Sequence, residues 1–419
     1  MHPLGVLVSG QTSTEKVPLN LIEVILAQGS LSKEPVWGNL PRQRRFPVSA
    51  LLVASETQMA SDASTIPADL LNFFALPEVS DDDFNAMALR LFAHQAQHNL
   101  PFQRFCQLRG KTPRSVKHWH DIPAVPINAF KDLTLSCVPP DTCARVFMTS
   151  GTTRGDVKGR HYHPALAVYD SSMRLNFAQH VMQGQERIRM GVLFPDEVAL
   201  PNSSLAHYLQ LALTHFGTAD SGYLMGAQGL DIAGLRTALQ QAQDSGQPFA
   251  LLGASYSLVH AMDALAALGQ SFQLPAGSWL FDTGGFKGQS REIEMDAFYD
   301  QLSATFGVPR THCINMYGMT ELSTQFYDRG NATVPSVKRG PHWIRSRVID
   351  PISGREMPRG ERGILVHTDL GNYNAVTTIL TEDVGVATDD GFVLLGRAQG
   401  AQAKGCSLAV EDFLKAARA

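Results

Sequence analysis

From about residue 145 to 395, short apolar runs alternate with segments whose apolar residues have helical spacing. Residues 192–194, 249–252 and 279–281 are short, continuous apolar runs, which is typical of buried strands. Residues 203–213 and 258–268 carry apolar side chains three and four positions apart, which predicts helices. Strands that alternate with helices along a chain indicate an α/β fold.

Two features before this region have a clear local pattern. Ser80 followed by three aspartates predicts the start of a helix, with an N-cap and an acidic first turn. Its apolar residues then fall on one helical face: Phe84, Met87, Ala88, Leu91 and Phe92. Residues 121–126 contain two prolines, which interrupt regular structure, and lead into Phe130-Lys131. We interpret this segment as a connector that delivers the chain to the core.

A segment rich in hydroxyls and glycines, residues 149–159, follows the apolar residues 146–148. Glycines allow backbone N–H groups to converge on an anion, hydroxyls add donors, and a lysine adds charge, so the segment suits phosphate binding. It is not a Walker A loop, because no Gly-Lys-Ser/Thr follows the glycines. Taken alone, it can equally be a polar surface loop after a strand. Its candidate ligands are Thr149, Ser150, Gly151, Thr152, Thr153 and Lys158.

Three later segments favour the phosphate-binding interpretation of this loop over that of a surface loop. Gly284-Gly285 follows an apolar strand, where a flat ring can lie against the backbone. Residues 315–321 combine an aromatic face, a glycine break, a hydroxyl and a carboxylate, and residues 381–385 provide a carboxylate that can accept two ribose hydroxyls. Each segment is common by itself, but the set in this order is specific. The residues concerned are Tyr317, Gly318, Thr320, Glu321 and Asp383, followed by Gly396-Arg397.

In this order the motifs resemble those of the adenylate-forming superfamily of acyl-CoA synthetases, peptide-synthetase adenylation domains and luciferases, over residues 66–419. The resemblance implies phosphate binding at residues 149–159, adenine and magnesium binding at Gly284-Gly285 and residues 317–321, and ribose binding at Asp383. It therefore implies ATP and Mg²⁺ as cofactors, with Glu321 as the metal ligand, and a hinge entered at Arg397. Residues 348–351 and 360–366 resemble the hairpin before the ribose strand. One departure is Arg154, which stands where the superfamily loop usually has glycine.

The end of the chain narrows the resemblance. In the superfamily a mobile C-terminal lid usually continues for about a hundred residues past the hinge, whereas only residues 396–419 follow here. This short tail, together with residues 121–131 and 283–288, resembles the LuxE-like acyl-protein synthetases of the bacterial luminescence fatty-acid reductase complex. In that family a cysteine near the C-terminus accepts the acyl group, and Cys406 occupies the matching position.

The expected organisation has three parts. Residues 1–65 form an N-terminal extension of unknown role, residues 66–395 the adenylate-forming α/β core domain, and residues 396–419 a short tail that carries Cys406. In fold class this is the large N-terminal domain of an adenylate-forming enzyme with a strongly truncated C-terminal lid.

The resemblance implies that the chain activates a carboxylic acid, a fatty acid in that family, as acyl-AMP and transfers it to Cys406, with Lys158 and Glu321 assisting. Lys404 and Arg397 are candidates to lower the pKa of the thiol. An acyl-CoA reductase-like protein, or another acyl acceptor, is the expected partner. Two alternatives stay open: an acyl-CoA or aryl-CoA ligase that uses free coenzyme A, and a non-catalytic nucleotide-binding scaffold. Cys406 can also be an inert buried thiol.

Composition and the remaining motifs exclude other classes. A chain of 419 residues with 44% apolar and 18% charged residues is typical of a globular protein, and a net charge of −4 gives no electrostatic case for nucleic acid. With no basic leader and no run of roughly 18 apolar residues, we expect a cytoplasmic protein without a membrane span. Five cysteines without CxxC spacing suggest neither a disulfide framework nor zinc.

Two further patterns point to chemistry but are incomplete. Residues 253–257 lack the final glycine of a hydrolase nucleophile elbow, so a strand-to-helix corner is the favoured interpretation. His118-x-His120 and His161-x-His163 can pair toward a metal, but no segment supplies the remaining ligands, and both pairs stay unassigned.

Overall fold

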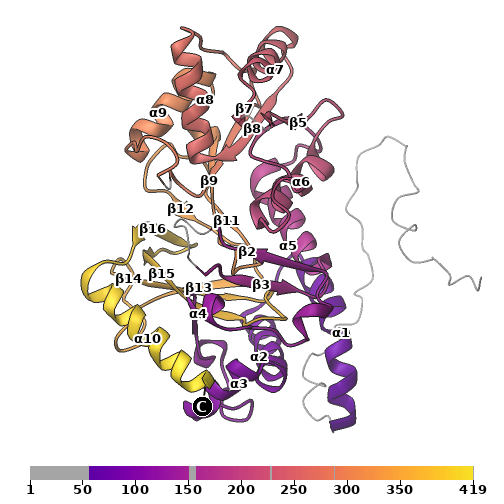
Figure 1. Ribbon diagram of the computed structural model, residues 1–419, viewed down its shortest axis with the longest axis vertical. Helices are drawn as coiled ribbons and strands as arrows, with labels where there is room; N and C mark the ends of the chain where they lie inside the picture. The colour runs from indigo at the N-terminus through magenta and orange to yellow at the C-terminus, as the bar shows by residue number, and fades with distance from the viewer. Residues whose placement is uncertain (1–55, 151–156, 227–228, 287, 419) are drawn as a thin grey trace, which may run out of the picture. The chain divides into compact units, whose positions relative to one another are not determined.

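The computed structural model describes residues 56–150, 157–226, 229–286 and 288–418 (Figure 1). One six-stranded sheet has the order β11-β10-β9-β8-β4-β5. All of its neighbouring strands are parallel except β11, which runs antiparallel to β10. The strands are β4 (Arg189–Leu193), β5 (Gly222–Tyr223), β8 (Phe249–Ala254), β9 (Trp279–Thr283), β10 (Cys313–Tyr317) and β11 (Phe326–Tyr327).

Helices cover both faces of this sheet, which explains why its strands are continuous apolar runs. Along β8, where every residue is buried, Ala250 and Leu252 pack with α5 and α6, whereas Phe249 and Leu251 pack with α7, α8 and α9. The α/β prediction is confirmed, as are both predicted helices. The bounds are α5 (Ala167–Phe177, continued by a π-helical turn at Ala178–Met182), α6 (Ser204–Phe216), α7 (Ile232–Ser245), α8 (Ser255–Ala267) and α9 (Met295–Phe306).

A second sheet has the order β12-β16-β15-β14-β13, and β1 adds to β15. Its strands are antiparallel except that β1 is parallel to β15. The predicted hairpin before the ribose strand is β13–β14, and the predicted connector ends in β1, where Val125 lies opposite Ile379. The strands are β1 (Val125–Pro126), β12 (Val337–Lys338), β13 (Ile344–Ile349), β14 (Arg362–Asp369), β15 (Thr378–Ala387) and β16 (Phe392–Arg397).

The helices α1 (Glu56–Phe74), α2 (Asp81–His98) and α3 (Leu100–Leu108) pack with the second sheet in one core cluster. The predicted helix start is confirmed, because Ser80 and Asp83 form a reciprocal capping box at the beginning of α2. The expected domain boundary at residues 65 and 66 falls inside α1, whose Ile66 and Leu70 are buried.

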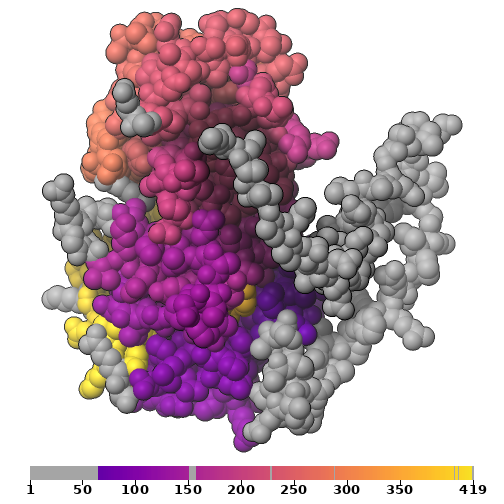
Figure 2. Space-filling view, turned by 45° about the vertical axis from the view of Figure 1, so that its right-hand side comes forward, coloured from indigo at the N-terminus to yellow at the C-terminus, as the bar shows by residue number. Residues whose placement is uncertain are grey.

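The segment expected as a short tail forms a long helix, α10 (Gly400–Arg418). Phe413 of α10 is fully buried against Phe105 of α3, with ring centroids 4.6 Å apart. Figure 2 shows α10, in yellow, at the surface of the described part of the chain. The tail is therefore a docked element in this structure, because its apolar face has a partner.

Shorter elements complete the described part of the chain. The hairpin β2 (Arg145–Met148) and β3 (Arg160–His163) brackets the candidate phosphate loop, and β6 (Met225–Gly226) pairs with β7 (Gly229–Leu230). The α-helical turn α4 (Ala129–Asp132) follows β1, and 3₁₀ turns lie at Trp119–Asp121, Pro140–Thr142 and Arg310–His312. None of the described helices has both the length and the apolar character to cross a membrane.

Candidate functional site

The candidate phosphate loop is a long connection between two hydrogen-bonded strands. At its base the N–H of Thr149 donates to the carbonyl oxygen of Gly159 at 3.0 Å, and the N–H of Gly159 donates to Thr149 Oγ1 at 2.9 Å. Ser150 and Lys158 are exposed beside this closure. The predicted ligands Gly151, Thr152 and Thr153, and Arg154, lie outside the described residues.

Glu321 lies directly against the end of this loop. A Cβ atom added to Gly159 would approach Glu321 Oε1 and Thr149 Cγ2 to 3.1 Å each, so only glycine fits here without displacement. Glu321 is 5% exposed, and burial raises the pKa of its carboxyl group to about 7, although the charges of Lys131 and Arg397 oppose that rise. The backbone N–H of Glu321 itself donates to this carboxylate, and no other described residue donates a hydrogen bond to it. Its oxygen atoms are therefore available to a hard cation.

The turn that carries Glu321 is held by His161 of β3. The Nδ1 of His161 donates to the carbonyl oxygen of Thr320 at 3.0 Å. Burial lowers the pKa of His161 to about 4, so its ring is neutral at pH 7 and carries one N–H for this bond. His161 thus ties the strand that leaves the phosphate loop to the Thr320–Glu321 turn. The sequence indicated only a histidine pair here and did not reveal this contact.

A buried polar loop, residues 369–377 between β14 and β15, supports the same turn from the other side. Asn372 Nδ2 donates to the carbonyl oxygen of Glu321 at 2.8 Å, and Asn372 Oδ1 accepts from the N–H of Ser323 at 2.9 Å. The carboxylate of Asp369 accepts from the N–H groups of Ser323 and Thr324 at 2.9 and 2.8 Å. These residues were missed in the sequence, where the only signal is a polar run between two apolar strands.

Tyr317, Asp383 and Arg397 form a second group beside Glu321. The hydroxyl of Tyr317 donates to Asp383 Oδ2 at 2.7 Å, and Arg397 Nε lies 3.4 Å from Asp383 Oδ1. Burial raises the pKa of Asp383, whereas the Tyr317 hydrogen bond and the Arg397 charge lower it. The structure therefore brings the predicted aromatic residue, the predicted ribose carboxylate and the predicted hinge arginine into one contact group.

The glycine pair follows β9, whose last residue, Thr283, lies opposite Met316, the residue before Tyr317. Gly284 and Gly285 have φ values of 78° and 68°, which favour glycine. Thr283 Oγ1 donates to the carbonyl oxygen of Met316 at 3.0 Å, so the end of β9 is fixed to the end of β10. Gly318 is exposed after β10.

The corner at residues 253–257 supports the glycine pair and shows no nucleophile–base arrangement. Ser255 Oγ donates to Asp282 Oδ2 at 2.8 Å and accepts from the N–H of Gly285 at 3.2 Å. Asp282 also accepts from Tyr299 at 2.9 Å and from Asn315 at 2.8 Å, and burial raises the pKa of its carboxyl group to about 6. The favoured interpretation of a strand-to-helix corner agrees with this geometry.

Cys406 lies on the face of α10 that packs on the second sheet. It is 4% exposed, and its Sγ is 3.8 Å from the carbonyl oxygen of Thr381. Burial, together with the charges of Glu382 and Asp383, raises the pKa of the thiol to about 11. The expected lowering of this pKa by Arg397 is not observed, because Arg397 pairs with Glu382 and Asp383; the side chain of Lys404 lies outside the described residues. The apolar neighbours of Cys406 are Ile349, Ile364, Val366, Leu380 and Val384.

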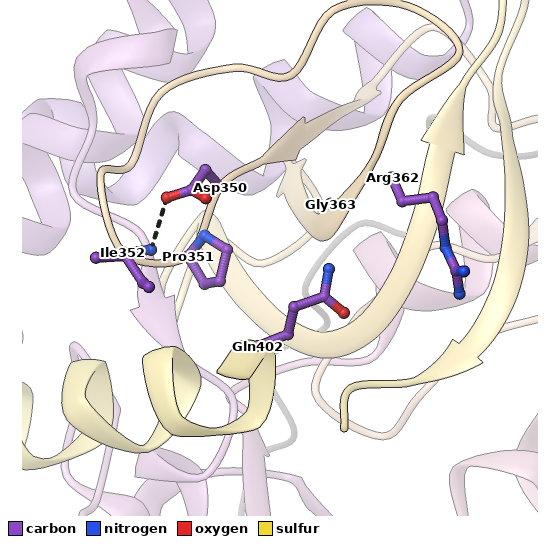
Figure 3. A pocket seen from close by; sticks show the side chains of 6 residues that line it. All are labelled: Asp350, Pro351, Ile352, Arg362, Gly363 and Gln402. Atoms are coloured by element: carbon purple, nitrogen blue, oxygen red, sulfur yellow. Dashed lines mark hydrogen bonds between the residues drawn. The ribbon is translucent and has the colours of Figure 1, made fainter. Parts of the chain in front are cut away.

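A small hollow lies between the turn after β13 and the start of α10 (Figure 3). Gln402, four residues before Cys406 and so on the same helical face, points into it. None of the residues predicted to bind the nucleotide lines this hollow. Its lining residues are Asp350, Pro351, Ile352, Arg362, Gly363 and Gln402.

The two histidine pairs do not form metal sites. His118 Nδ1 accepts from the N–H of His120 at the start of a 3₁₀ turn, and the buried rings of His161 and His163 on β3 lie tilted to each other, with centroids 4.2 Å apart. In the ranges that the structure describes, no three His, Cys, Asp or Glu side chains come close enough to hold a metal ion by themselves. A site at Glu321 would need further oxygen ligands from a substrate, as is usual for magnesium bound with nucleotide phosphates.

The fold is that of adenylate-forming enzymes. The chain is similar to 2-hydroxyisobutyryl-CoA ligase in an open conformation in complex with 2-HIB-AMP and CoA, with a TM-score of 0.56 and 16% identity, covering 76% of this chain and 69% of that chain. The thioesterification-state structure of that ligase gives a TM-score of 0.51 at 15% identity, covering 81% of this chain and 67% of that chain. At these identities the likeness shows the fold.

The sequence itself identifies the family within this class. Residues 62–415 match the family described as acyl-protein synthetase, LuxE, and the chain belongs to it. It is also similar to the long-chain-fatty-acid–luciferin-component ligase of Vibrio harveyi, with 22% identity over 381 residues that cover 87% of this chain and 98% of that protein. The predicted family is confirmed, and the chain is an AMP-forming acid–thiol ligase.

Proposed function

We propose that this chain activates a long-chain fatty acid as acyl-AMP and transfers the acyl group to Cys406. The observation that carries the proposal is the junction of Gly159 with Glu321, beside the Tyr317–Asp383 hydrogen bond. It joins the end of a candidate phosphate loop, a buried carboxylate and a ribose-type carboxylate in one place. The choice of a fatty acid rests on the family and on the name of the Vibrio harveyi relative.

In the first step a carboxylate oxygen of the acid bonds to the α-phosphorus of ATP while the bond from that phosphorus to pyrophosphate breaks. We assign phosphate binding to the described residues Thr149, Ser150 and Lys158, and to Gly151, Thr152 and Thr153 of the same loop. Asp383 would accept the ribose hydroxyls, with Arg397 fixing its orientation. The adenine ring would lie between Gly284-Gly285 and the segment of Tyr317 and Gly318.

We assign Glu321 as the ligand of a magnesium ion that neutralises phosphate charge when bound. The fit is chemical, because a buried carboxylate without a hydrogen-bond donor from another described residue suits a hard cation. His161, through Thr320, and Asn372 hold the backbone of this turn, so Glu321 is oriented before the nucleotide arrives.

In the second step the thiol of Cys406 loses its proton to solvent, and the resulting thiolate sulfur bonds to the acyl carbon while the bond from that carbon to the phosphate oxygen of AMP breaks, so that AMP leaves. Because Cys406 is 4% exposed with a raised pKa, this step requires α10 to leave its docked position. The same burial favours the alternative in which free coenzyme A accepts the acyl group. In our proposal the acyl group passes from Cys406 to an acyl-CoA reductase-like protein or another acceptor.

We further propose a cytoplasmic location for the enzyme. All five cysteines are free thiols, which suits a reducing compartment.

The exchange of labelled pyrophosphate into ATP, measured with a panel of carboxylic acids, tests the first step. We expect exchange that depends on a long-chain acid, and a fall of about one to two decades in Asp383→Ala, which loses a charge-assisted contact to the nucleotide. Asp389→Ala is the matched control, because Asp389 is an exposed carboxylate whose partner is Arg359 on the surface. Exchange with none of the acids would contradict the proposed activation of a long-chain fatty acid.

A further inference from the structure

The predicted connector ends beside the candidate site. After β1 pairs with β15, the N–H of Ile127 donates to the carbonyl oxygen of Leu380 at 2.9 Å, three residues before Asp383. Asn128 Nδ2 donates to Glu382 Oε1, the residue adjacent to Asp383. These contacts fix α4 to the strand that carries the ribose carboxylate.

A second set of contacts fixes the same turn to the phosphate loop. Phe130 is fully buried, with its ring 5.8 Å from that of His161 in a T-shaped arrangement. A Cβ atom added to Gly159 would lie 3.7 Å from the Cβ of Phe130. The residue before Lys131 is therefore packed against the end of the phosphate loop, on an element that is rigidly placed by its neighbours.

Lys131 itself is exposed on this turn. Within the described residues its ammonium group has neither an ion pair nor a hydrogen bond, so none of the described carboxylates neutralises its charge by direct contact. Its positive charge, like that of Arg397, opposes the rise in the pKa of the buried Glu321 carboxyl group. An uncompensated cation beside a phosphate-binding loop and a candidate magnesium ligand suits a triphosphate.

We propose that Lys131 is a phosphate-contacting catalytic residue of the adenylation step. This inference rests on the proposed function and adds a residue from the connector to the loop that holds Lys158. Lys131 keeps its proton throughout: it stabilises the negative charge on the phosphate oxygens as the carboxylate–phosphorus bond forms and the bond to pyrophosphate breaks. Its placement on α4 puts this charge on an element that contacts both β15 and the end of the phosphate loop.

The test is steady-state pyrophosphate exchange by the full chain, with ATP and a long-chain fatty acid varied separately, for wild type, Lys131→Met and Lys131→Arg. Lys117→Met is the matched control, because Lys117 is an exposed lysine whose backbone carbonyl oxygen accepts a hydrogen bond from Asn85 Nδ2. We expect Lys131→Met to lower kcat of exchange about tenfold to a hundredfold, Lys131→Arg to recover most of that loss, and Lys117→Met to match wild type. Because Lys131 is exposed, the melting temperature of all four proteins should be the same.

Wild-type exchange in Lys131→Met overturns the inference and leaves the proposed function intact. An equal loss in Lys131→Met and Lys131→Arg also overturns it, since a charge-dependent role requires the arginine to rescue. If wild type shows no exchange with any acid, the proposed function fails first and the role of Lys131 fails with it.

Discussion

Burial and nearby charge act in opposite directions on the carboxyl group of Glu321, which is 5% exposed beside Gly159. Burial dominates and raises its pKa to about 7, while Lys131 and Arg397 limit the rise. A group with this pKa changes charge in the range where the enzyme would work. The proposed binding of magnesium by Glu321 should therefore depend on pH.

We predict that the rate of pyrophosphate exchange rises with pH through about 7, because magnesium needs the ionised carboxylate and the protonated form predominates below the pKa. More magnesium should move the midpoint to lower pH, since the ion competes with the proton. Rates measured across this range at low and high magnesium check the prediction. In Glu321→Gln both dependences should disappear, and an unchanged profile in that variant would remove Glu321 from the metal site.

The residues that sequence patterns reveal are those whose chemistry is local. Gly284 and Gly285 could be selected because the requirement for positive φ belongs to the residue itself. His161, Asp369 and Asn372 could not, because their partners Thr320, Thr324 and Glu321 are far away in the chain. Only the folded chain shows which polar side chain supports which turn.

At the scale of helices and strands, local sequence patterns again predict what depends on neighbouring residues. Segments with a strong apolar periodicity and a cap were predicted correctly. One example is α2, where Ser80 and Asp83 cap the helix. The docking of the tail could not be predicted, because the apolar face of α10 contacts α3 and the second sheet, which lie far away in the sequence. Its core contact is Phe413 against Phe105. This docking decides how accessible Cys406 is.

We predict that Phe413→Ala releases α10 and exposes Cys406. Removing a buried phenylalanine costs about 3–5 kcal/mol of packing, which should fall on the docking of α10 because Phe413 is fully buried between that helix and α3. The rate of Cys406 alkylation by iodoacetamide, followed by mass spectrometry, should rise. Leu408→Ala is the control on the same helix, because Leu408 is 59% exposed and its loss should leave the alkylation rate at the wild-type value. Equal rates in all three proteins would mean that docking of α10 does not protect the thiol.

For the whole molecule, the site depends on how the two sheets meet. Lys338 of β12, in the second sheet, binds Asp328 Oδ2 at 2.7 Å and the carbonyl oxygen of Asn315 in β10, in the first sheet, at 3.2 Å. Asn315 in turn donates a hydrogen bond to Asp282. Asp282 also accepts from the hydroxyl of Ser255, and that hydroxyl accepts from the N–H of Gly285. Polar contacts thus link the ribose-strand sheet to the glycine pair of the other sheet.

The α/β class and the order of motifs could be predicted because each depends on local pattern. The second sheet was visible in the sequence only as one hairpin and a ribose strand, since its pairing with β1, β12 and β16 joins distant segments. The same limit applies to Cys406: its place in the sequence suggested an acceptor, but only the docked helix shows that its thiol is buried.

The most direct test of the account measures where the acyl group resides after adenylation. Wild type and Cys406→Ser are incubated with ATP, magnesium and a radiolabelled long-chain fatty acid, then denatured and treated with hydroxylamine. Serine keeps the size of cysteine but lacks the thiolate that attacks an acyl adenylate at neutral pH. We predict hydroxylamine-labile label on wild type and none on Cys406→Ser, with pyrophosphate exchange near the wild-type rate in both. Label on Cys406→Ser at the wild-type level, or no label on either protein while coenzyme A releases AMP, would contradict the account.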